Sequence, residues 1–142
     1  MAIRRPRTDP TENHIQADYF SWLHMRSRKY PQLEMAFHIP NGSYKSFTAR
    51  RIFKAIGLKP GVPDVFLPVA ESGYHGLWIE FKTKSGRVSD AQKDWFEKLQ
   101  KQNYAVAVCR SWTEAAQLTL TYLGLPPEFE NEKGEILNEK GR

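Results

Sequence analysis

The amino-acid sequence predicts an α/β fold in which a small mixed sheet is flanked by helices. Segments with helix caps and a helical spacing of apolar residues alternate with short apolar segments of strand length. Two of these strands are separated by only seven residues, 70–76, which favours an antiparallel hairpin. The expected order is α, β, α, β, β, α, β, α, and such an order places helices against a shared sheet.

A basic arm, residues 1–9, precedes the first expected helix. Asp9 should start this helix, because Pro10 then takes the first helical position and Glu12 takes the acid position of a capping box. The apolar stripe of the helix consists of Ile15, Tyr19, Trp22, Leu23 and Met25. This stripe predicts that one face of the helix packs on the core.

A short strand and a basic helix come next. The strand is expected over residues 34–39 and ends at the turn signal Pro40-Asn41-Gly42. The basic helix is expected over residues 46–56, with Gly57 at its C-terminal cap.

The rest of the chain supplies the hairpin, two helices and another strand. The hairpin strands are expected over residues 62–69 and 77–83. Capping boxes at 89–92 and 111–114 open two helices. The nearly continuous apolar run at 104–109 predicts a buried strand between them.

Length and composition restrict the class of protein. A chain of 142 residues with 40% hydrophobic content predicts one domain, 10–125, followed by an acidic tail, 126–142. The single cysteine, Cys109, excludes a disulfide framework and a cysteine-based zinc site. No apolar run approaches the roughly 20 residues of a membrane span, and the start lacks a signal-peptide stretch. We therefore expect a cytoplasmic protein without a membrane partner.

The net charge of +5 is unevenly distributed. Residues 1–60 hold eleven Lys and Arg against four Asp and Glu, whereas residues 61–125 hold seven of each. A basic first half favours a polyanionic partner such as nucleic acid. Ordinary solubilising charge explains it equally well, so the function has to be argued from a site.

The hairpin contains the residues that point to chemistry. Side chains alternate across a strand, so Glu80 and Lys82 share one face with Trp78, while the other face holds Leu77, Ile79 and Phe81. Asp64 lies on the first hairpin strand. Two carboxylates brought together across a hairpin repel each other, and a hard divalent cation relieves that repulsion. The pattern predicts a Mg²⁺ or Mn²⁺ site at which a bound water becomes a nucleophile.

An acid–lysine pair on a solvated face is the alternative interpretation of this pattern. Glu-x-Lys alone is too common to be informative. The combination of Gly61-Val62-Pro63-Asp64 with Glu80-Phe81-Lys82, one hairpin apart, is much more specific.

These residues resemble the PD-(D/E)xK nuclease superfamily, and more closely its virus-type replication-repair branch, the VRR-NUC domain. Further matches are Glu12, Gln16, the segment 38–42, and Ser89 with Gln92. The resemblance covers roughly residues 10–123 and implies a restriction-endonuclease-like core. The stand-alone length is similar to that of phage and bacterial members.

The resemblance also implies roles for individual residues. Asp64, Glu80 and the backbone carbonyl of Phe81 become metal ligands, and Glu12 approaches the metal directly or through water. Lys82 becomes the catalytic lysine. Gln92 helps to position Lys82 or the substrate. Local helix capping is an alternative explanation for both Glu12 and Gln92.

Two groups of cations are candidates for binding the DNA backbone. The first lies on or just before the basic helix and comprises Lys45, Arg50, Arg51 and Lys54. The second follows the catalytic lysine and comprises Lys84 and Arg87. Such contacts add affinity and salt sensitivity without sequence information. A solvated helix face is the alternative for the first group.

The expected function is that of a Mg²⁺- or Mn²⁺-dependent, structure-specific endodeoxyribonuclease. The resemblance implies a homodimer that cuts branched DNA such as four-way (Holliday) junctions, and the first helix has apolar residues to spare for an interface. Two alternatives stay open. One is a nuclease for flaps, nicks or unbranched duplex, and the other is a non-catalytic DNA-binding module with a degenerate nuclease fold.

Overall fold

Four short strands form one mixed sheet in the computed structural model, which describes residues 9–40 and 46–129. Their order is β1-β2-β3-β4, and they span Phe37–His38, Val65–Leu67, Leu77–Phe81 and Ala105–Cys109. β1 pairs with β2, and β2 with β3, in antiparallel fashion, whereas β3 and β4 are parallel. The predicted α/β class and the antiparallel hairpin are both confirmed.

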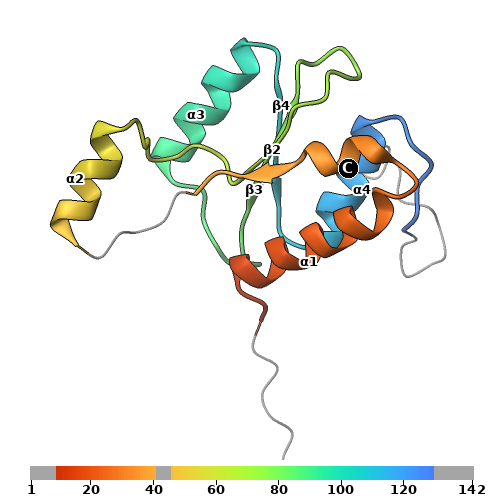
Figure 1. Ribbon diagram of the computed structural model, residues 1–142, viewed down its shortest axis with the longest axis horizontal. Coiled ribbons are helices and arrows are strands. Elements are labelled where there is room, and N and C mark those ends of the chain that lie inside the picture. The colour runs from red at the N-terminus through yellow and green to blue at the C-terminus, as the bar shows by residue number, and fades with distance from the viewer. Residues whose placement is uncertain (1–8, 41–45, 130–142) are drawn as a thin grey trace, which may run out of the picture.

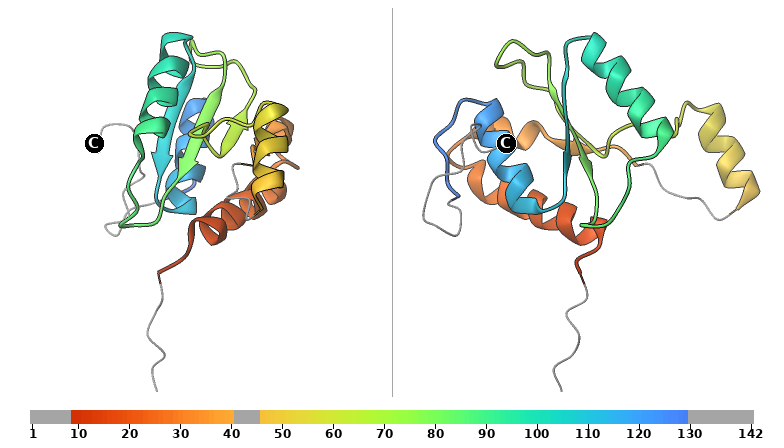
Figure 2. Two further views of the ribbon diagram at one scale, coloured as in Figure 1. Left: turned by 90° about the vertical axis from the view of Figure 1, so that its left-hand side faces the viewer. Right: turned by 180° about the vertical axis from the view of Figure 1, so that it is seen from behind.

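Helices cover both faces of this sheet (Figures 1 and 2). α1 (Glu12–Arg26) and α4 (Trp112–Tyr122) pack against each other on one face, where Tyr19 contacts Phe81. α3 (Asp90–Lys101) contacts β4 and reaches Glu80 through Gln92. Because neighbouring residues of a strand point to opposite faces, α1 and α3 lie on opposite sides of β3.

The start of α1 differs from the sequence prediction. Thr11, not Asp9, is the N-cap, and its hydroxyl accepts a hydrogen bond from the His14 N–H at 3.3 Å. Glu12 is therefore the first helical residue and does not take the acid position of a capping box. A threonine hydroxyl satisfies an otherwise unpaired N–H, and this fixes the helix start two residues later than expected.

The apolar stripe of α1 is confirmed except at its end. Ile15, Tyr19, Trp22 and Leu23 are buried, but Met25 is 63% exposed. Met25 follows only Trp22 by such a spacing, whereas Arg26 follows Trp22 by four residues and Leu23 by three and so lies nearer the middle of the stripe. Arg26 packs instead against the first residues after α4, where its Nε donates to the Glu128 carboxylate at 2.7 Å.

The strand expected over residues 34–39 is only partly formed. A 3₁₀ helix, η1 (Pro31–Met35), precedes it, and β1 has two residues. Pro31 explains this result, because its ring fixes φ near the helical value and suits the first turn of a helix. The first hairpin strand is also shorter than predicted, since β2 begins after Pro63 and Asp64.

The basic helix is confirmed as α2 (Phe47–Ala55), which projects from the rest of the molecule (Figure 1). The Ser46 hydroxyl caps it by accepting from the Ala49 N–H at 2.9 Å. No residue of α2 is buried, and Phe47, Ile52 and Ile56 are each more than half exposed. The helix therefore contributes surface rather than core.

The core lies between the sheet and the α1–α4 pair. Tyr19 is fully buried, and its hydroxyl forms a 2.7 Å hydrogen bond with Thr119 of α4. The strand expected to be buried, β4, is buried only at Cys109, because it forms one edge of the described sheet. None of the helices in residues 9–40 and 46–129 combines the length and apolar character that a membrane span requires.

Candidate active site

Asp64 and Phe81 connect the two hairpin strands at one end of the sheet. Asp64 immediately precedes β2, and its Oδ2 accepts a hydrogen bond from the Phe81 backbone N–H at 2.8 Å. The side chain of Asp64 therefore takes the place of a backbone acceptor and is fixed beside Glu80, the neighbour of Phe81. His38 packs on the same segment, with its Nδ1 2.8 Å from the Asp64 carbonyl oxygen.

Glu80 is the most unusual residue of the site. Its carboxylate lies in the sheet with only 2% of the residue exposed. Its Oε1 accepts from Gln92 Nε2 at 2.6 Å and lies 3.3 Å from Lys82 Nζ. Its Oε2 is buried without a hydrogen-bond partner. A buried acceptor without a partner costs about 1–3 kcal/mol, so this oxygen is suited to an external ligand.

Gln92 caps its helix, as considered from the sequence, and its side chain also reaches Glu80. Its side-chain oxygen accepts from the Ser89 N–H at 2.9 Å, and the Ser89 hydroxyl accepts from the Gln92 N–H at 3.2 Å. This capping box starts α3. The Gln92 Nε2 group takes no part in this cap and donates to Glu80 instead. The hydrogen bonds that start α3 therefore also place Gln92 in the site.

Gly61 holds the loop before Asp64 against the first turn of α3. Its φ is +90°, a conformation that favours glycine. A Cβ at this position would lie 2.5 Å from both the carbonyl carbon and the oxygen of Ala91 and 2.9 Å from the Gln92 nitrogen. A side chain at position 61 would therefore push the Asp64 loop and α3 apart. In the sequence, Gly61 is recognisable only as part of the motif.

Burial and mutual repulsion change the acidity of the two carboxyl groups. Loss of solvation, and then the charge of Asp64, raise the pKa of Glu80 to about 8, against partial compensation from Lys82. Loss of solvation also raises the pKa of Asp64, although the Phe81 N–H and His38 oppose the change. The pair is thus poorly suited to two full negative charges unless a cation is present.

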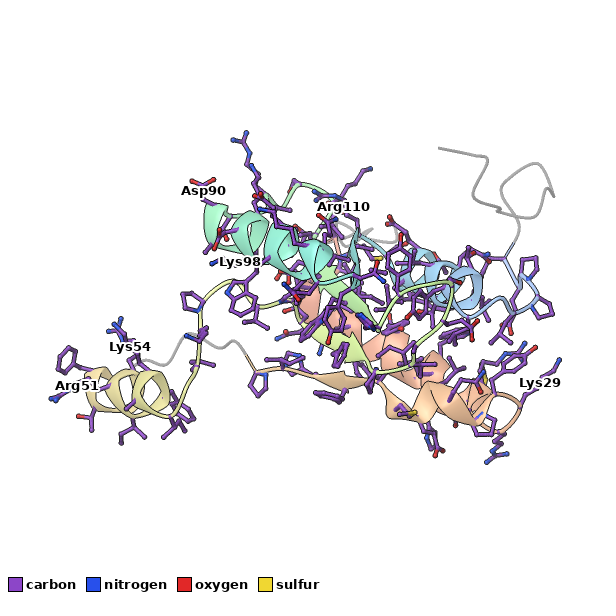
Figure 3. The ribbon with its side chains drawn as sticks, turned by 90° about the horizontal axis from the view of Figure 1, so that it is seen from above. Lys29, Arg51, Lys54, Asp90, Lys98 and Arg110 are labelled. Atoms are coloured by element: carbon purple, nitrogen blue, oxygen red, sulfur yellow. The ribbon has the colours of Figure 1, made fainter. Side chains whose placement is uncertain are left out.

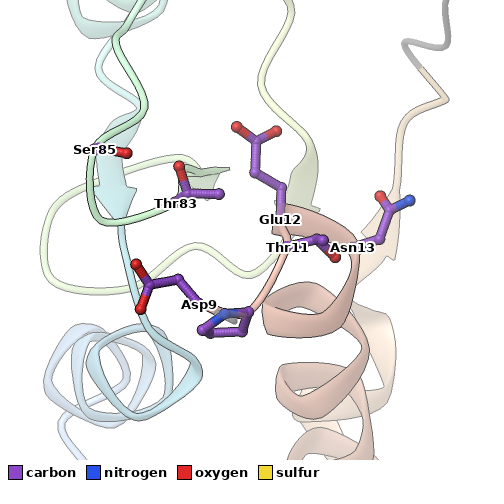
Figure 4. A pocket seen from close by; sticks show the side chains of 7 residues that line it. Asp9, Thr11, Glu12, Asn13, Thr83 and Ser85 are labelled. Atoms are coloured by element: carbon purple, nitrogen blue, oxygen red, sulfur yellow. The ribbon is translucent and has the colours of Figure 1, made fainter. Parts of the chain in front are cut away.

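Glu12 reaches the site from the first turn of α1. Its Oε1 lies 3.9 Å from Lys82 Nζ, and about half of its side chain is exposed. Figure 4 shows Glu12 extending toward the loop that follows β3. Between them is a hollow of about 480 Å³ whose lining comprises residues 9–13, Thr83 and Ser85. Glu12 does not cap its helix, so its position fits a role in the site.

The oxygen donors of the site are those that a hard divalent cation prefers, although they are few. Among residues 9–40 and 46–129, no three His, Cys, Asp or Glu side chains gather as a metal-binding group. The carboxylates close enough to share a cation are Asp64 and Glu80, and Glu80 Oε2 lacks a partner. Mg²⁺ commonly takes one or two carboxylates and completes its shell with water and phosphate oxygens. The residues present fit such an ion.

The predicted DNA-binding residues fall in two separate places. Arg50, Arg51 and Lys54 are exposed on α2, which stands apart from the sheet (Figure 3). Lys84 and Arg87 are exposed on the loop directly after Lys82. The remaining candidate, Lys45, lies outside the described residues, as does most of the expected basic arm.

One residue of this region, Arg110, was not found from the sequence. It follows β4, and its Nη1 lies 2.7 Å from the carbonyl oxygens of Thr83 and Gly86 in the loop after Lys82. A lone arginine between an apolar strand and a helix cap has no recognisable pattern, so only the tertiary structure associates it with the site.

Buried Glu80 and half-buried Asp64 lie close to Lys82 in a restriction-endonuclease-like mixed sheet, an arrangement typical of a nuclease. The VRR-NUC domain model matches residues 10–112, and the chain belongs to the VRR-NUC family. A solved structure named "VRR_NUC domain protein" is similar, with a TM-score of 0.71 and 27% sequence identity over 84% of this chain and 93% of that one. No curated protein matches the sequence.

We predict that the stabilising effect of the metal increases with pH. An acid whose pKa is raised on folding keeps its proton in the folded protein, so in the metal-free state Glu80 destabilises the fold as pH rises from its usual pKa toward 8. A cation that displaces this proton removes the penalty. The Tm increase caused by Mn²⁺, measured by scanning calorimetry, should be larger at about pH 8.5 than at about pH 6.

Glu80→Gln is the matched control for this measurement. It keeps the shape of the side chain but removes the titration, so its smaller Tm increase should not depend on pH in this range. An equal pH dependence in wild type and Glu80→Gln would assign the effect to another group.

Proposed function

We propose that this protein is a Mg²⁺- or Mn²⁺-dependent endodeoxyribonuclease that hydrolyses phosphodiester bonds in branched DNA. The observation that supports this most strongly is the buried Glu80 carboxylate, with one oxygen unpaired, Asp64 beside it and Lys82 at 3.3 Å. We place its action in the cytoplasm of a bacterial or phage-infected cell, where DNA is accessible.

Each side chain of the site would have a separate role in the reaction. Asp64, Glu80 and the Phe81 carbonyl would hold the ion, with Glu12 as a direct or water-mediated fourth contributor. The bound ion supplies positive charge that polarises the phosphate and acidifies water. Lys82 points its ammonium into the same space, where it neutralises charge that develops on the phosphate. Gln92 keeps Glu80 oriented through their 2.6 Å hydrogen bond.

A non-catalytic DNA-binding module accounts less well for this arrangement. Such a module has no need for a buried carboxylate with an unpaired oxygen, which lowers stability and repels phosphate. A nuclease acting on flaps, nicks or plain duplex has the same site chemistry. The two enzymatic alternatives therefore differ in substrate geometry and are separated by the DNA that is cut.

The branched substrate and the homodimer are proposed together. Two strands must be cut to resolve a four-way junction, and a two-fold dimer presents two equivalent sites. On α1, Tyr19, Trp22 and Leu23 are buried in the core of the same chain, which leaves Met25, 63% exposed, as apolar surface for an interface. Further exposed apolar side chains are found on α2, at Phe47 and Ile52, and at its C-cap, Ile56.

Lys82→Ala should lower the cleavage rate by about 10²–10³-fold and leave metal binding intact, because the ammonium acts in the transition state. Asp64→Asn and Glu80→Gln should abolish cleavage and also weaken metal binding. Turnover of labelled DNA and Mn²⁺ titration calorimetry measure the two effects. Lys101→Ala, an equal loss of charge on exposed α3, is the control. Full activity in Glu80→Gln would refute the assignment of the active site.

The triple variant Arg50→Ala/Arg51→Ala/Lys54→Ala should weaken binding to all DNA shapes. It should also flatten the dependence of log K on log salt by roughly one unit per lost phosphate contact. A matched variant replaces Lys93, Lys98 and Lys101 on α3 and loses the same charge. Fluorescence anisotropy across a salt series compares the two. If both variants changed the salt slope equally, general charge rather than α2 would account for binding.

The protein should cut four-way junctions faster than flaps, splayed arms or plain duplex, and should have the mass of a dimer. Light scattering on the purified protein gives the mass, and a panel of labelled DNA structures with Mg²⁺ gives the preference. Addition of EDTA should stop cleavage reversibly. If the protein were a monomer and cut duplex as fast as junctions, the proposed homodimer and the proposed branched substrate would both be wrong. The nuclease function itself would be unaffected.

A further inference from the structure

Arg110 connects the end of β4 to the loop that follows the candidate catalytic lysine. One guanidinium nitrogen, Nη1, lies 2.7 Å from the carbonyl oxygen of Thr83 and 2.7 Å from that of Gly86. The same two residues close a turn, because the Gly86 N–H donates to the Thr83 carbonyl at 3.1 Å. Arg110 therefore clamps both ends of one four-residue turn.

The clamped turn packs against the side chain of Lys82. A Cβ placed on Gly86 would lie 3.5 Å from Lys82 Cδ and 2.9 Å from the Thr83 hydroxyl. The Lys82 backbone is held from the same side, because its N–H donates to the Cys109 carbonyl at 3.0 Å. Consequently the backbone of Lys82 and the stem of its side chain both depend on residues 109 and 110.

Arg110 itself is held by α4. Its backbone N–H donates to Glu114 Oε2 at 2.9 Å, and Ser111, the next residue, caps the helix. The side chain is exposed to solvent, yet among the described residues it is in no ion pair and instead donates to two neutral carbonyls. An exposed arginine has water as an alternative partner, so two short bonds to one turn indicate a specific structural task.

The location of Arg110 distinguishes it from the cations of the DNA surface. In Figure 3 it lies far from Arg51 and Lys54 on α2. The turn that it clamps supplies Thr83 and Ser85 to the hollow beside Glu12 (Figure 4). By holding this turn, Arg110 fixes one wall of the space next to the Lys82 ammonium.

We propose that Arg110 is a positioning residue that holds the turn from Thr83 to Gly86 against Lys82 and so keeps the lysine ammonium directed at the reacting phosphate. This inference rests on the proposed nuclease function. Misplacement of a catalytic group by about 1 Å can cost about 100-fold in rate. Loss of the clamp should therefore lower kcat about 10- to 100-fold without weakening DNA binding.

The test compares three variants of the full chain. Arg110→Met keeps the length of the side chain but has no donor, and Arg110→Lys keeps the charge and can still donate to a carbonyl. Lys98→Ala, on exposed α3, removes one charge elsewhere. Steady-state cleavage of labelled DNA with Mg²⁺ gives kcat and KM. Hydrogen exchange by mass spectrometry reports the opening of residues 83–87 and of β3 separately.

The expected result is a specific loss. Arg110→Met should lower kcat while KM changes less than about twofold, Arg110→Lys should recover part of the loss, and Lys98→Ala should match wild type. Exchange should accelerate in residues 83–87 but not in β3. Since the effect passes through Lys82, adding Arg110→Met to Lys82→Ala should change kcat far less than it does in wild type.

Several results would overturn the proposal. Unchanged kcat in Arg110→Met, with wild type active, would show that the clamp is not needed. A rise in KM with kcat unchanged would make Arg110 a DNA contact instead. An equal loss of protection in β3 would mean a general structural role. Failure of wild type to cut any DNA would refute the nuclease function itself, whereas the exchange data would still report on the clamp.

Discussion

The burial of the Glu80 carboxylate beside Asp64 is the constraint on which the rest of the structure depends. An ionised carboxylate in a sheet is expensive, and a second one next to it adds repulsion. The chain offsets this cost with Gln92 from α3 and with Lys82, which directly follows β3. One Glu80 oxygen still lacks a partner among the described residues, and this is the place at which we propose a cation.

The surrounding fold supplies these partners from segments that are distant in sequence. Gly61 lets the loop before Asp64 approach the backbone of α3, and this contact brings Gln92 within reach of Glu80. The Phe81 N–H fixes Asp64. The geometry of the candidate site is thus a consequence of ordinary structural devices, namely a glycine contact, a capping box and a side-chain bond to a strand.

The described residues form a packed body and one exposed helix, α2. The aromatic residues of α1 stabilise the body, where Tyr19 contacts Phe81 and bonds Thr119. α2 has no fully buried residue and carries cations together with exposed apolar side chains. A helix of this kind gains little from its own chain, which agrees with a role in contacting DNA or a second subunit.

The sequence by itself determined the hairpin, the acid–acid–lysine pattern, the α/β class and the main helices, because strand alternation, caps and apolar spacing are local properties. It misplaced the start of α1 by two residues, gave Met25 to the core and overestimated β1, since neighbouring caps and Pro31 compete over short distances. Only the tertiary structure decided that Gln92 both caps α3 and binds Glu80, and that Arg110 clamps the loop after Lys82. Such contacts join residues that have no common local pattern, so they arise only when separate elements pack together.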